Sequence, residues 1–273
     1  SMISGVIPRW VTTKPAVIDA WSGPGMHTNG TEATRAIAML VGLTGQVEEP
    51  GTVLFADKKY PSFFVRSKPT TPRVDGAGSK YKFAHSSGVY VETRDAMITG
   101  QPYRPKAAFF VFQNFVLSVP NVARNLQALN NLELIVAVDT HMSETALMAD
   151  YVIPGTVFLE RYEAVAEWAT FPVVALRQPV VPPVFGQKPE YEFVADLARR
   201  MGYNDYPFNV PYEKYLDDAL RAGPGISLSD LKALPGATWV GGQTRYRKYQ
   251  TSGFATPIAL STALNSMIQR TNC

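Results

Sequence analysis

The sequence predicts an α/β fold with a mostly parallel, open sheet that carries helices on both faces in a Rossmann-like layout, followed by a small helical and irregular tail. Apolar runs of strand length at residues 106–113, 133–138 and 150–154 alternate with segments of helical period at 121–131 and 143–149. Strand, helix, strand, helix, strand at this spacing indicates parallel pairing with right-handed crossovers. The tail is expected because short helical patterns and an irregular stretch follow the last long helix.

Composition places the chain among ordinary globular proteins. It has 273 residues, of which 46% are hydrophobic and 18% are charged, so it can bury a sizeable core. The formal net charge is only +3, and the lysines and arginines form no run, which argues against a nucleic-acid partner. No apolar run approaches the roughly 20 residues that a membrane span needs, so we expect no direct membrane insertion.

Cysteine and histidine usage limits the metal chemistry expected of this chain. The single cysteine, Cys273, can form neither an internal disulfide framework nor a cysteine-ligated zinc or iron–sulfur site. His141 and Glu144 could form part of a metal site, but no third ligand has a recognisable spacing, so no metal site is predicted. No Ser/His/Asp or Cys/His arrangement is recognisable either, and the catalytic residues stay unknown.

Two regions are expected along the chain. Residues 1–205 form the α/β domain, which includes a long surface excursion at 46–88 that is rich in proline, glycine, serine and lysine. Residues 206–273 form the tail. The domain opens with an apolar run at 16–21 that predicts a strand, followed by a turn-rich segment.

Further helices follow from the helical period. The first runs from about Glu32 to Leu43, and Gly45 supplies its end. The prolines of residues 178–189 exclude both a helix and a central strand there. Beyond them, helices are expected at residues 190–203, 212–222 and 227–234.

The sheet predicts where a ligand binds. An open parallel sheet binds its ligand outside the carboxyl ends of its strands, where Asn114 and Asp139 both fall. The Asp139 carboxylate can accept hydrogen bonds from ribose hydroxyls or from the N1–H and exocyclic amine of guanine. The alternative is that it is an N-terminal cap or a solvated strand end. Ser118 and the helix start near Asn121, with its unpaired N–H groups, could contact phosphate.

The loop at residues 114–121 argues against a nicotinamide-linked dehydrogenase. It contains no glycine, so its backbone cannot approach a pyrophosphate as a nicotinamide-binding loop does. A second polar segment, residues 23–35, has glycines that allow tight turns and close approach of a ligand, Gly25 among them. His27, Asn29 and Arg35 supply hydrogen-bond donors there. The alternative is a surface turn with a polar helix start.

Three segments in order resemble the molybdopterin oxidoreductases, the dimethyl sulfoxide reductase family. Residues 23–52 look like the glycine loop and Arg-Ala helix of that family, ending in Leu-Thr-Gly and Pro-Gly. Residues 101–121 resemble its strand and Gly-x-Asn-Pro loop, with Asn114 kept and Phe115 in place of the proline. Residues 138–161 are similar to its signature of Asp, Thr-Glu-Thr-Ala, Ala-Asp, Leu-Pro and Glu, and this match is the most specific.

The resemblance implies that the chain binds part of a bis(molybdopterin guanine dinucleotide) cofactor. Asn114 and Ser118 would lie along the diphosphate or ribose, and Asp139 and Thr140 would meet the guanosine end. Asp150 would mainly fix the next strand. The cofactor-binding residues predicted on this basis are Gly25, His27, Asn29, Asn114, Ser118, Asp139, Thr140, His141, Glu144 and Thr145.

The resemblance also implies a function and partners. The pattern looks most like the branch that reduces polysulfide, thiosulfate, tetrathionate or arsenate. The chain resembles the central part of such a catalytic subunit, with molybdenum and an iron–sulfur cluster bound outside it, so we expect it to be inactive alone. Its partners would be the rest of the same subunit, an iron–sulfur electron-transfer subunit and a membrane anchor, in an extracytoplasmic, membrane-associated complex. The alternative is a non-catalytic α/β module that binds a nucleotide or a protein.

Overall fold

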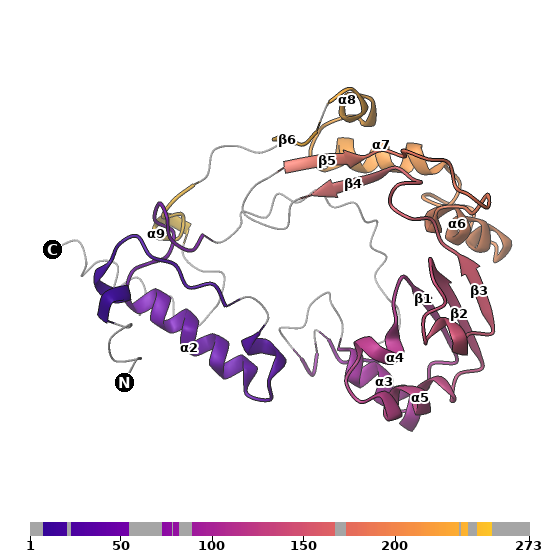
Figure 1. Ribbon diagram of the computed structural model, residues 1–273, viewed down its shortest axis with the longest axis horizontal. Coiled ribbons are helices and arrows are strands. Elements are labelled where there is room, and N and C mark those ends of the chain that lie inside the picture. Colours follow the sequence, from indigo (N-terminus) through magenta and orange to yellow (C-terminus); the bar gives the residue numbers. More distant parts are fainter. Residues whose placement is uncertain are drawn as a thin grey trace. The chain divides into compact units, whose positions relative to one another are not determined.

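The computed structural model describes most of the chain, in two compact units (Figure 1). The first unit comprises Ser1–Lys59, Glu167–Val173 and Gly241–Cys273, and the second comprises Tyr60–Ala166 and Val174–Val240. The described residues are 8–20, 23–54, 73–77, 79–81, 89–166, 173–234, 236–239 and 245–252. Much of the excursion predicted at 46–88 lies outside them.

The first unit contains one long helix. Helix α2 spans Gly30–Leu43, two residues longer at its start than expected, and Gly45 follows it in the left-handed region at φ 68°. Gly30 is needed at the start because a Cβ there would lie 2.5 Å from the carbonyl oxygen of Pro24. Among the described residues of this unit, residues 8–12 are also helical, and η1 (Pro24–Met26) and α9 (Tyr249–Ser252) are two further short elements.

The prediction of a strand at residues 16–21 is wrong for residues 16–20, which the structure describes. Residues 16–20 have no regular secondary structure, and residues 21–22 lie outside the described part. The N–H of Ala16 donates to the side chain of Gln46 at 2.5 Å, and Gln46 in turn donates to the carbonyl of Trp10 at 3.1 Å. A buried glutamine, rather than a neighbouring strand, therefore satisfies this stretch of backbone.

The parallel sheet predicted in the middle of the chain is confirmed. Its strand order is β1-β2-β3, and both neighbouring pairs are parallel. Helices flank it, so the α/β fold class is confirmed as well (Figure 1). The bounds are β1 Ala107–Val111, β2 Leu134–Asp139, β3 Tyr151–Pro154, α3 Tyr90–Thr99, α4 Phe115–Ser118, α5 Val122–Leu129 and η2 Ala146–Met148.

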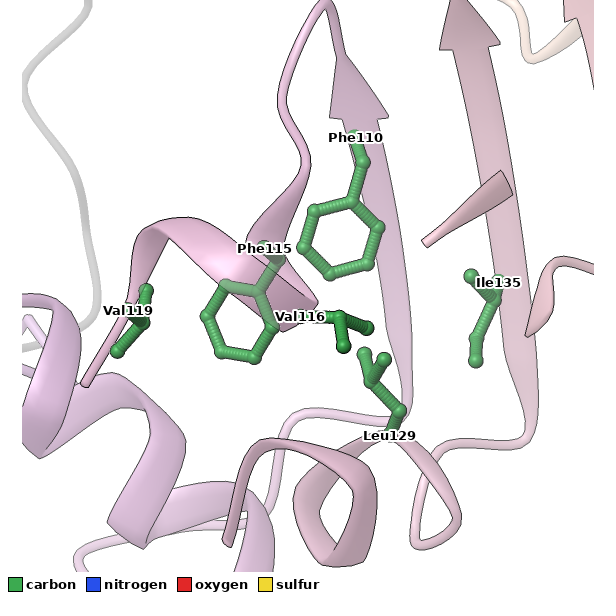
Figure 2. Packing of buried hydrophobic residues seen from close by; sticks show 6 residues of the cluster. All are labelled: Phe110, Phe115, Val116, Val119, Leu129 and Ile135. Carbon is green, nitrogen blue, oxygen red and sulfur yellow. The ribbon is translucent and has the colours of Figure 1, made fainter. Parts of the chain in front are cut away.

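The central strand is the most buried, which explains its unbroken apolar run. Residues 135–138 of β2 are all buried, as expected for a strand covered on both faces. On one face, side chains from β1, α4, α5 and β2 form a continuous cluster in which the rings of Phe110 and Phe115 lie 5.3 Å apart. Figure 2 shows its members: Phe110, Phe115, Val116, Val119, Leu129 and Ile135.

The connection between β1 and β2 differs from the prediction in its details. The segment predicted as a loop contains the short helix α4, and α5 begins at Val122, one residue after the predicted start near Asn121. Its cap is Asn121, whose backbone adopts φ 73° and whose side-chain oxygen accepts from the N–H of Arg124 at 3.2 Å. Asparagine tolerates this left-handed conformation better than most residues, which fixes the start of the helix.

The second compact unit also contains an antiparallel pair of strands that the sequence did not predict. Strands β4 (Glu163–Ala166) and β5 (Val173–Arg177) are antiparallel, and β6 (Thr238–Trp239) lies on the other side of β5. One end of the pair is closed by an ion pair, in which the guanidinium of Arg177 lies 2.6 Å from the carboxylate of Glu163. The strands are only four and five residues long, so they give a weak signal in the sequence.

The three C-terminal helices are confirmed. They are α6 (Glu190–Arg200), α7 (Tyr212–Ala222) and α8 (Leu228–Ala233), and Ser227 caps α8 in a capping box with Asp230. Helices α7 and α8 pack on β5 through a buried cluster, so this part of the expected tail shares a core with earlier residues. The cluster consists of Val174, Leu216, Leu220, Leu228 and Leu231. The predicted division of the chain at residue 205 stays a prediction.

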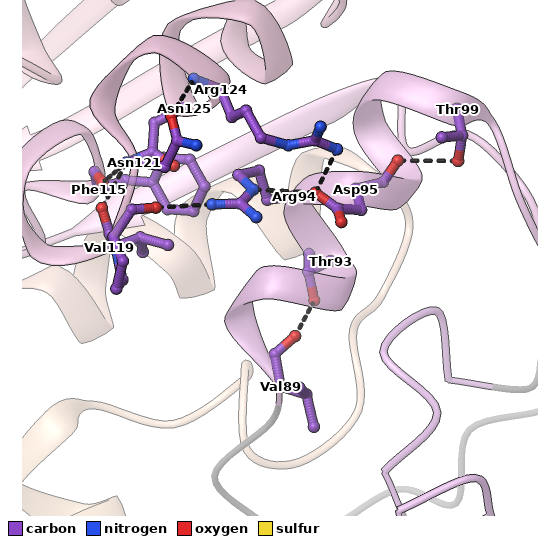
Figure 3. A network of polar contacts seen from close by, with 11 residues as sticks. Val89, Thr93, Arg94, Asp95, Thr99, Phe115, Val119, Asn121, Arg124 and Asn125 are labelled. Carbon is purple, nitrogen blue, oxygen red and sulfur yellow. Dashed lines mark hydrogen bonds and ion pairs between the residues drawn. The ribbon is translucent and has the colours of Figure 1, made fainter. Parts of the chain in front are cut away.

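A buried asparagine ties α4 to α5 (Figure 3). Asn125 is fully buried, and its amide donates to the carbonyls of Val119 at 2.6 Å and Val116 at 2.9 Å.

Two arginines near α5 stabilise the carboxylate of Asp95. Burial raises the pKa of Asp95, but hydrogen bonds from Arg94 and Arg124, each at 3.0 Å, hold this pKa below its usual value. Within the described ranges, no helix is both long and apolar enough for a membrane crossing.

Replacing Asn125 tests this tie. Asn125→Ala should lower the free energy of unfolding by about 2–4 kcal/mol, because buried carbonyls lose their donor. Asn125→Asp should lower it further, since a carboxylate would face those carbonyls. Urea unfolding measures both, with the exposed Gln127→Ala on the same helix as control. Equal stability of the alanine variant and the control would refute the assignment.

Candidate functional site

The carboxyl ends of β1 and β2 lie side by side at one edge of the parallel sheet. Val111 pairs with Val138, so the chain leaves both strands at the same level. Asn114 follows β1 as the residue that precedes α4, and Asp139 is the last residue of β2. Both side chains make hydrogen bonds to the segment 143–145, which joins them into one polar edge.

The Asp139 carboxylate is held in a fixed orientation. One oxygen accepts from the backbone N–H of Thr140 at 2.8 Å, and the other accepts from the hydroxyl of Ser143 at 2.9 Å. The carboxylate therefore also holds the start of the loop that follows β2. A carboxylate offers about four acceptor positions, so these two bonds leave about half of them for a ligand. Among the described residues, no lysine or arginine forms an ion pair with it.

A buried hydroxyl fixes Asn114. Thr145 is fully buried, accepts from the backbone N–H of Val116 at 3.0 Å and donates to the side-chain oxygen of Asn114 at 3.0 Å. The amide nitrogen of Asn114 donates to the carboxylate of Glu144 at 2.6 Å. These bonds specify which end of the Asn114 amide is the donor, and hold the side chain in one orientation.

Glu144 is ionised more readily than an ordinary glutamate. Its own backbone N–H and the amide of Asn114 stabilise the carboxylate and lower its pKa, with a small opposing effect of burial. Together with Asp139 it makes this edge of the sheet negatively charged at neutral pH. Such an edge favours ligand groups that donate hydrogen bonds over groups that carry negative charge.

The other predicted residues of this edge are more exposed. The hydroxyl of Thr140 lies 2.9 Å from Nδ1 of His141, and both residues are exposed. Ser118 is exposed at the end of α4. A helix was predicted at residues 143–149, but only the short 3-10 helix η2 forms there, and it begins after Thr145. Ser143 instead accepts from the N–H of Ala146 at 3.3 Å while it donates to Asp139.

Gly25, His27 and Asn29 belong to the other compact unit. They lie in and around η1, where both polar side chains are exposed and Asn29 makes no capping hydrogen bond to α2. Their part in binding stays a prediction.

Asp150 fixes the third strand. Its carboxylate accepts from the N–H of Ile135 at 2.7 Å, while its own N–H donates to the carbonyl of Ile135 at 2.9 Å.

The loop after β3 is fixed by Glu160, a buried carboxylate that accepts from the N–H of Val157 and from the side chain of Gln187. Among the described residues, no three His, Cys, Asp or Glu side chains gather in a way that could hold a metal ion.

The edge includes residues that sequence reasoning missed. Phe112, one step beyond the Val111–Val138 pair, adopts φ 51°, and its ring lies against Gly155. The guanidinium of Arg161 lies over this ring, 5.2 Å from its centroid. The Gly-x-Asn-Pro pattern, which has glycine two residues before its asparagine, was the available signal for an unusual backbone at position 112.

Comparison with known proteins identifies the family. Residues 10–200 match the molybdopterin oxidoreductase family. The chain belongs to this family. The resemblance found in the sequence is thereby confirmed, and membership implies a molybdopterin cofactor that carries molybdenum.

Three similar proteins show the range of activities among its relatives. Acetylene hydratase of Syntrophotalea acetylenica is 35% identical over 129 residues, which cover 46% of this chain and 18% of that protein. The molybdopterin-containing subunit PhsA of the Salmonella typhimurium thiosulfate reductase is 32% identical over 141 residues, 51% of this chain and 19% of the relative. The corresponding subunit ArrA of the Chrysiogenes arsenatis arsenate respiratory reductase is 26% identical over 76% of this chain and 27% of the relative.

A solved structure confirms the fold. Acetylene hydratase from Pelobacter acetylenicus matches with a TM-score of 0.70 and 24% identity, over 91% of this chain and 38% of that one. Most of the chain therefore has a structural counterpart in that protein. It spans only about a fifth to a quarter of the length of the three curated relatives.

Removing the Thr145 hydroxyl should destabilise the protein. Thr145→Val keeps the shape but leaves the buried N–H of Val116 without its acceptor, which should lower the free energy of unfolding by about 1–3 kcal/mol. Thr145→Ser should recover most of that loss. Urea unfolding measures both, with Thr31→Val at an exposed position as control. A valine variant as stable as the control would contradict the bridging role.

The contact between Asn114 and Glu144 should survive mild acid. Because the pKa of Glu144 is lowered, the contact contributes fully above the ordinary value of 4.5 and is lost only as pH falls through the lowered pKa. An NMR titration of the Asn114 side-chain amide should therefore show a midpoint below 4.5. The titration step should be absent in Glu144→Gln. A midpoint at or above the ordinary glutamate pKa would show that the Asn114 amide does not stabilise the Glu144 carboxylate.

Proposed function

We propose that the polar edge of β1 and β2 binds the guanosine end of molybdopterin guanine dinucleotide, in an enzyme that reduces a sulfur or arsenic oxyanion or polysulfide. The observation that supports this most directly is the Asp139 carboxylate. It stands at the carboxyl end of the central parallel strand, oriented by Thr140 and Ser143, and keeps acceptor positions for a ligand.

The chemistry of Asp139 fits guanine. Guanine presents its N1–H and exocyclic amine side by side, and a carboxylate can accept from both at once. Adenine presents an acceptor at N1, which would leave two acceptors facing each other. A site built to pair with donors rejects such a base, because its own polar groups are then unpaired.

The remaining residues of the polar edge would hold the rest of the nucleotide. Asn114 and Thr140 offer groups for ribose hydroxyls, while His141 and Glu144 border the guanosine end. The diphosphate would run away from the two carboxylates, past Ser118 toward the start of α5, where unpaired backbone N–H groups favour an anion. When bound, the cofactor supplies two-electron transfer at molybdenum, and this chain contributes binding and orientation.

The substrate class is proposed from the relatives. A thiosulfate reductase and an arsenate respiratory reductase are both similar to this chain. Because the chain spans only part of them, the molybdenum ligand and an iron–sulfur cluster would lie in further residues of the same catalytic subunit. We infer an iron–sulfur electron-transfer subunit and a membrane anchor as partners, an extracytoplasmic location for the complex, and no turnover by this chain alone.

A second reaction is favoured by one relative. The 35% identical protein is an acetylene hydratase, so hydration of acetylene is the second candidate and would use the same nucleotide edge. Full-length protein separates the candidates, since only a reductase oxidises reduced viologen dye when thiosulfate, tetrathionate, polysulfide or arsenate is added. A non-catalytic binding module would bind nucleotide without either activity.

Base selectivity tests the role of Asp139. The chain should bind GMP more tightly than AMP, and Asp139→Asn should weaken GMP binding about tenfold or more, because an amide presents a donor to a guanine donor. Calorimetric titration of both nucleotides measures this. Asp205→Asn, at an exposed carboxylate, is the matched control and should bind GMP like the unmodified chain. Equal affinity of the unmodified chain for GMP and AMP would overturn the proposal.

A further inference from the structure

Phe112 has a backbone conformation that a bulky residue rarely adopts. It directly follows β1, at φ 51°, in the left-handed region that glycine occupies without strain. Its N–H donates to the carbonyl of Val138 at 2.8 Å, so the backbone continues the parallel ladder. Glycine would make that same hydrogen bond. The backbone alone therefore does not explain why a phenylalanine stands here.

The surroundings of the ring hold it in place. A Cβ on Gly155 would lie 2.5 Å from Cε1 and 2.9 Å from Cζ of Phe112, so only glycine leaves room for the ring. The guanidinium of Arg161 lies 5.2 Å from the ring centroid, within the range of a cation–π contact. Despite these contacts, 39% of Phe112 remains exposed.

Arg161 is itself fixed. Its side chain is 11% exposed and lies 3.7 Å from the carboxylate of Glu190 and 3.9 Å from that of Glu163. It also donates to the carbonyl oxygen of Thr156 and, at 3.1 Å, to its hydroxyl. Arg161 is thus held by several partners, and its cation–π contact favours one position of the Phe112 ring.

The ring of Phe112 lies against a glycine that also contacts the backbone of Asp139. Gly155 donates its N–H to the carbonyl of Asp139 at 3.0 Å, and its Cβ position is 3.6 Å from the Asp139 carbonyl carbon. One glycine therefore touches both the ring of Phe112 and the backbone of Asp139. A partly exposed aromatic ring and a carboxylate with unused acceptor positions share this corner of the sheet edge.

We propose that Phe112 is a stacking residue for a purine ring whose hydrogen-bonding edge is bound by Asp139. This inference rests on the proposed nucleotide function of the polar edge. Bases stack on aromatic side chains, and stacking on a ring that is already ordered requires little further loss of conformational freedom. Gly155 and Arg161 act as positioning residues, because they hold the ring rather than touch the ligand.

Substitution of Phe112 separates stacking from folding. Phe112→Gly keeps the backbone conformation and removes the ring, while Phe112→Leu keeps an apolar side chain without an aromatic face. Both variants should bind GMP about tenfold more weakly than the unmodified chain. Both should unfold cooperatively in urea. Phe158→Leu is the matched control, since Phe158 is also exposed and lies 5.7 Å from an arginine guanidinium, that of Arg177.

A second readout reports stacking directly. The H8 proton of GMP should move upfield in the proton NMR spectrum when the unmodified chain or Phe158→Leu is added, because it lies over an aromatic ring. The shift should be lost with Phe112→Gly and Phe112→Leu. Ribose 5-phosphate, which has no base, should bind all four proteins alike.

The outcomes distinguish the two proposals. Selective GMP binding that depends on Asp139 but is unchanged in both Phe112 variants would overturn the stacking role and leave the proposed function standing. A chain that binds GMP no better than AMP would overturn the proposed function and the stacking role together. If Phe112→Gly failed to fold, the GMP affinity of Phe112→Leu would decide whether Phe112 stacks on the base.

Discussion

Parallel pairing of β1 and β2 is the constraint on which the polar edge depends. Two parallel strands cannot be joined by a tight turn, so the chain must leave β1 through α4 and α5 before it returns as β2. Each strand then ends at the same edge, and the first polar residues after each strand meet there. Had the strands been antiparallel, Asn114 and Asp139 would stand at opposite ends of the pair.

The polar edge is rigid because it rests on a packed core. Phe115 and Val116 lie within the apolar cluster below α4, and the N–H of Val116 is bound by the buried hydroxyl of Thr145. That hydroxyl also orients Asn114, so packing and ligand-facing polarity are linked through a single atom. Binding groups placed in this way lose little freedom when a ligand arrives, which is the physical advantage of building a site on strands and short helices.

Local signals account for what the sequence predicted. Apolar runs and helical periods located β1, β2, β3 and the three C-terminal helices, and the rule for parallel sheets located Asn114 and Asp139. The failures have distant causes. Residues 16–20 carry a strand-like pattern, yet the side chain of Gln46 satisfies Ala16 from 30 positions away. Strands β4 and β5 are short and are stabilised by pairing with each other, which no single stretch of sequence reveals. The ring of Phe112 depends on Gly155 and Arg161, which no local pattern connects to it.

Under the proposed function, charge would sort the two ends of a nucleotide. Asp139 and the readily ionised Glu144 both belong to the polar edge, so a phosphate placed between them would be repelled. The base and ribose carry the donors that suit these carboxylates, and the start of α5 offers N–H groups that suit an anion. Residues 114–121, which connect β1 to α5, contain no glycine, so their backbone cannot approach a pyrophosphate closely. We infer that the chain grips the nucleotide by its base, and that the diphosphate is held more loosely at this edge than in a nicotinamide-binding fold.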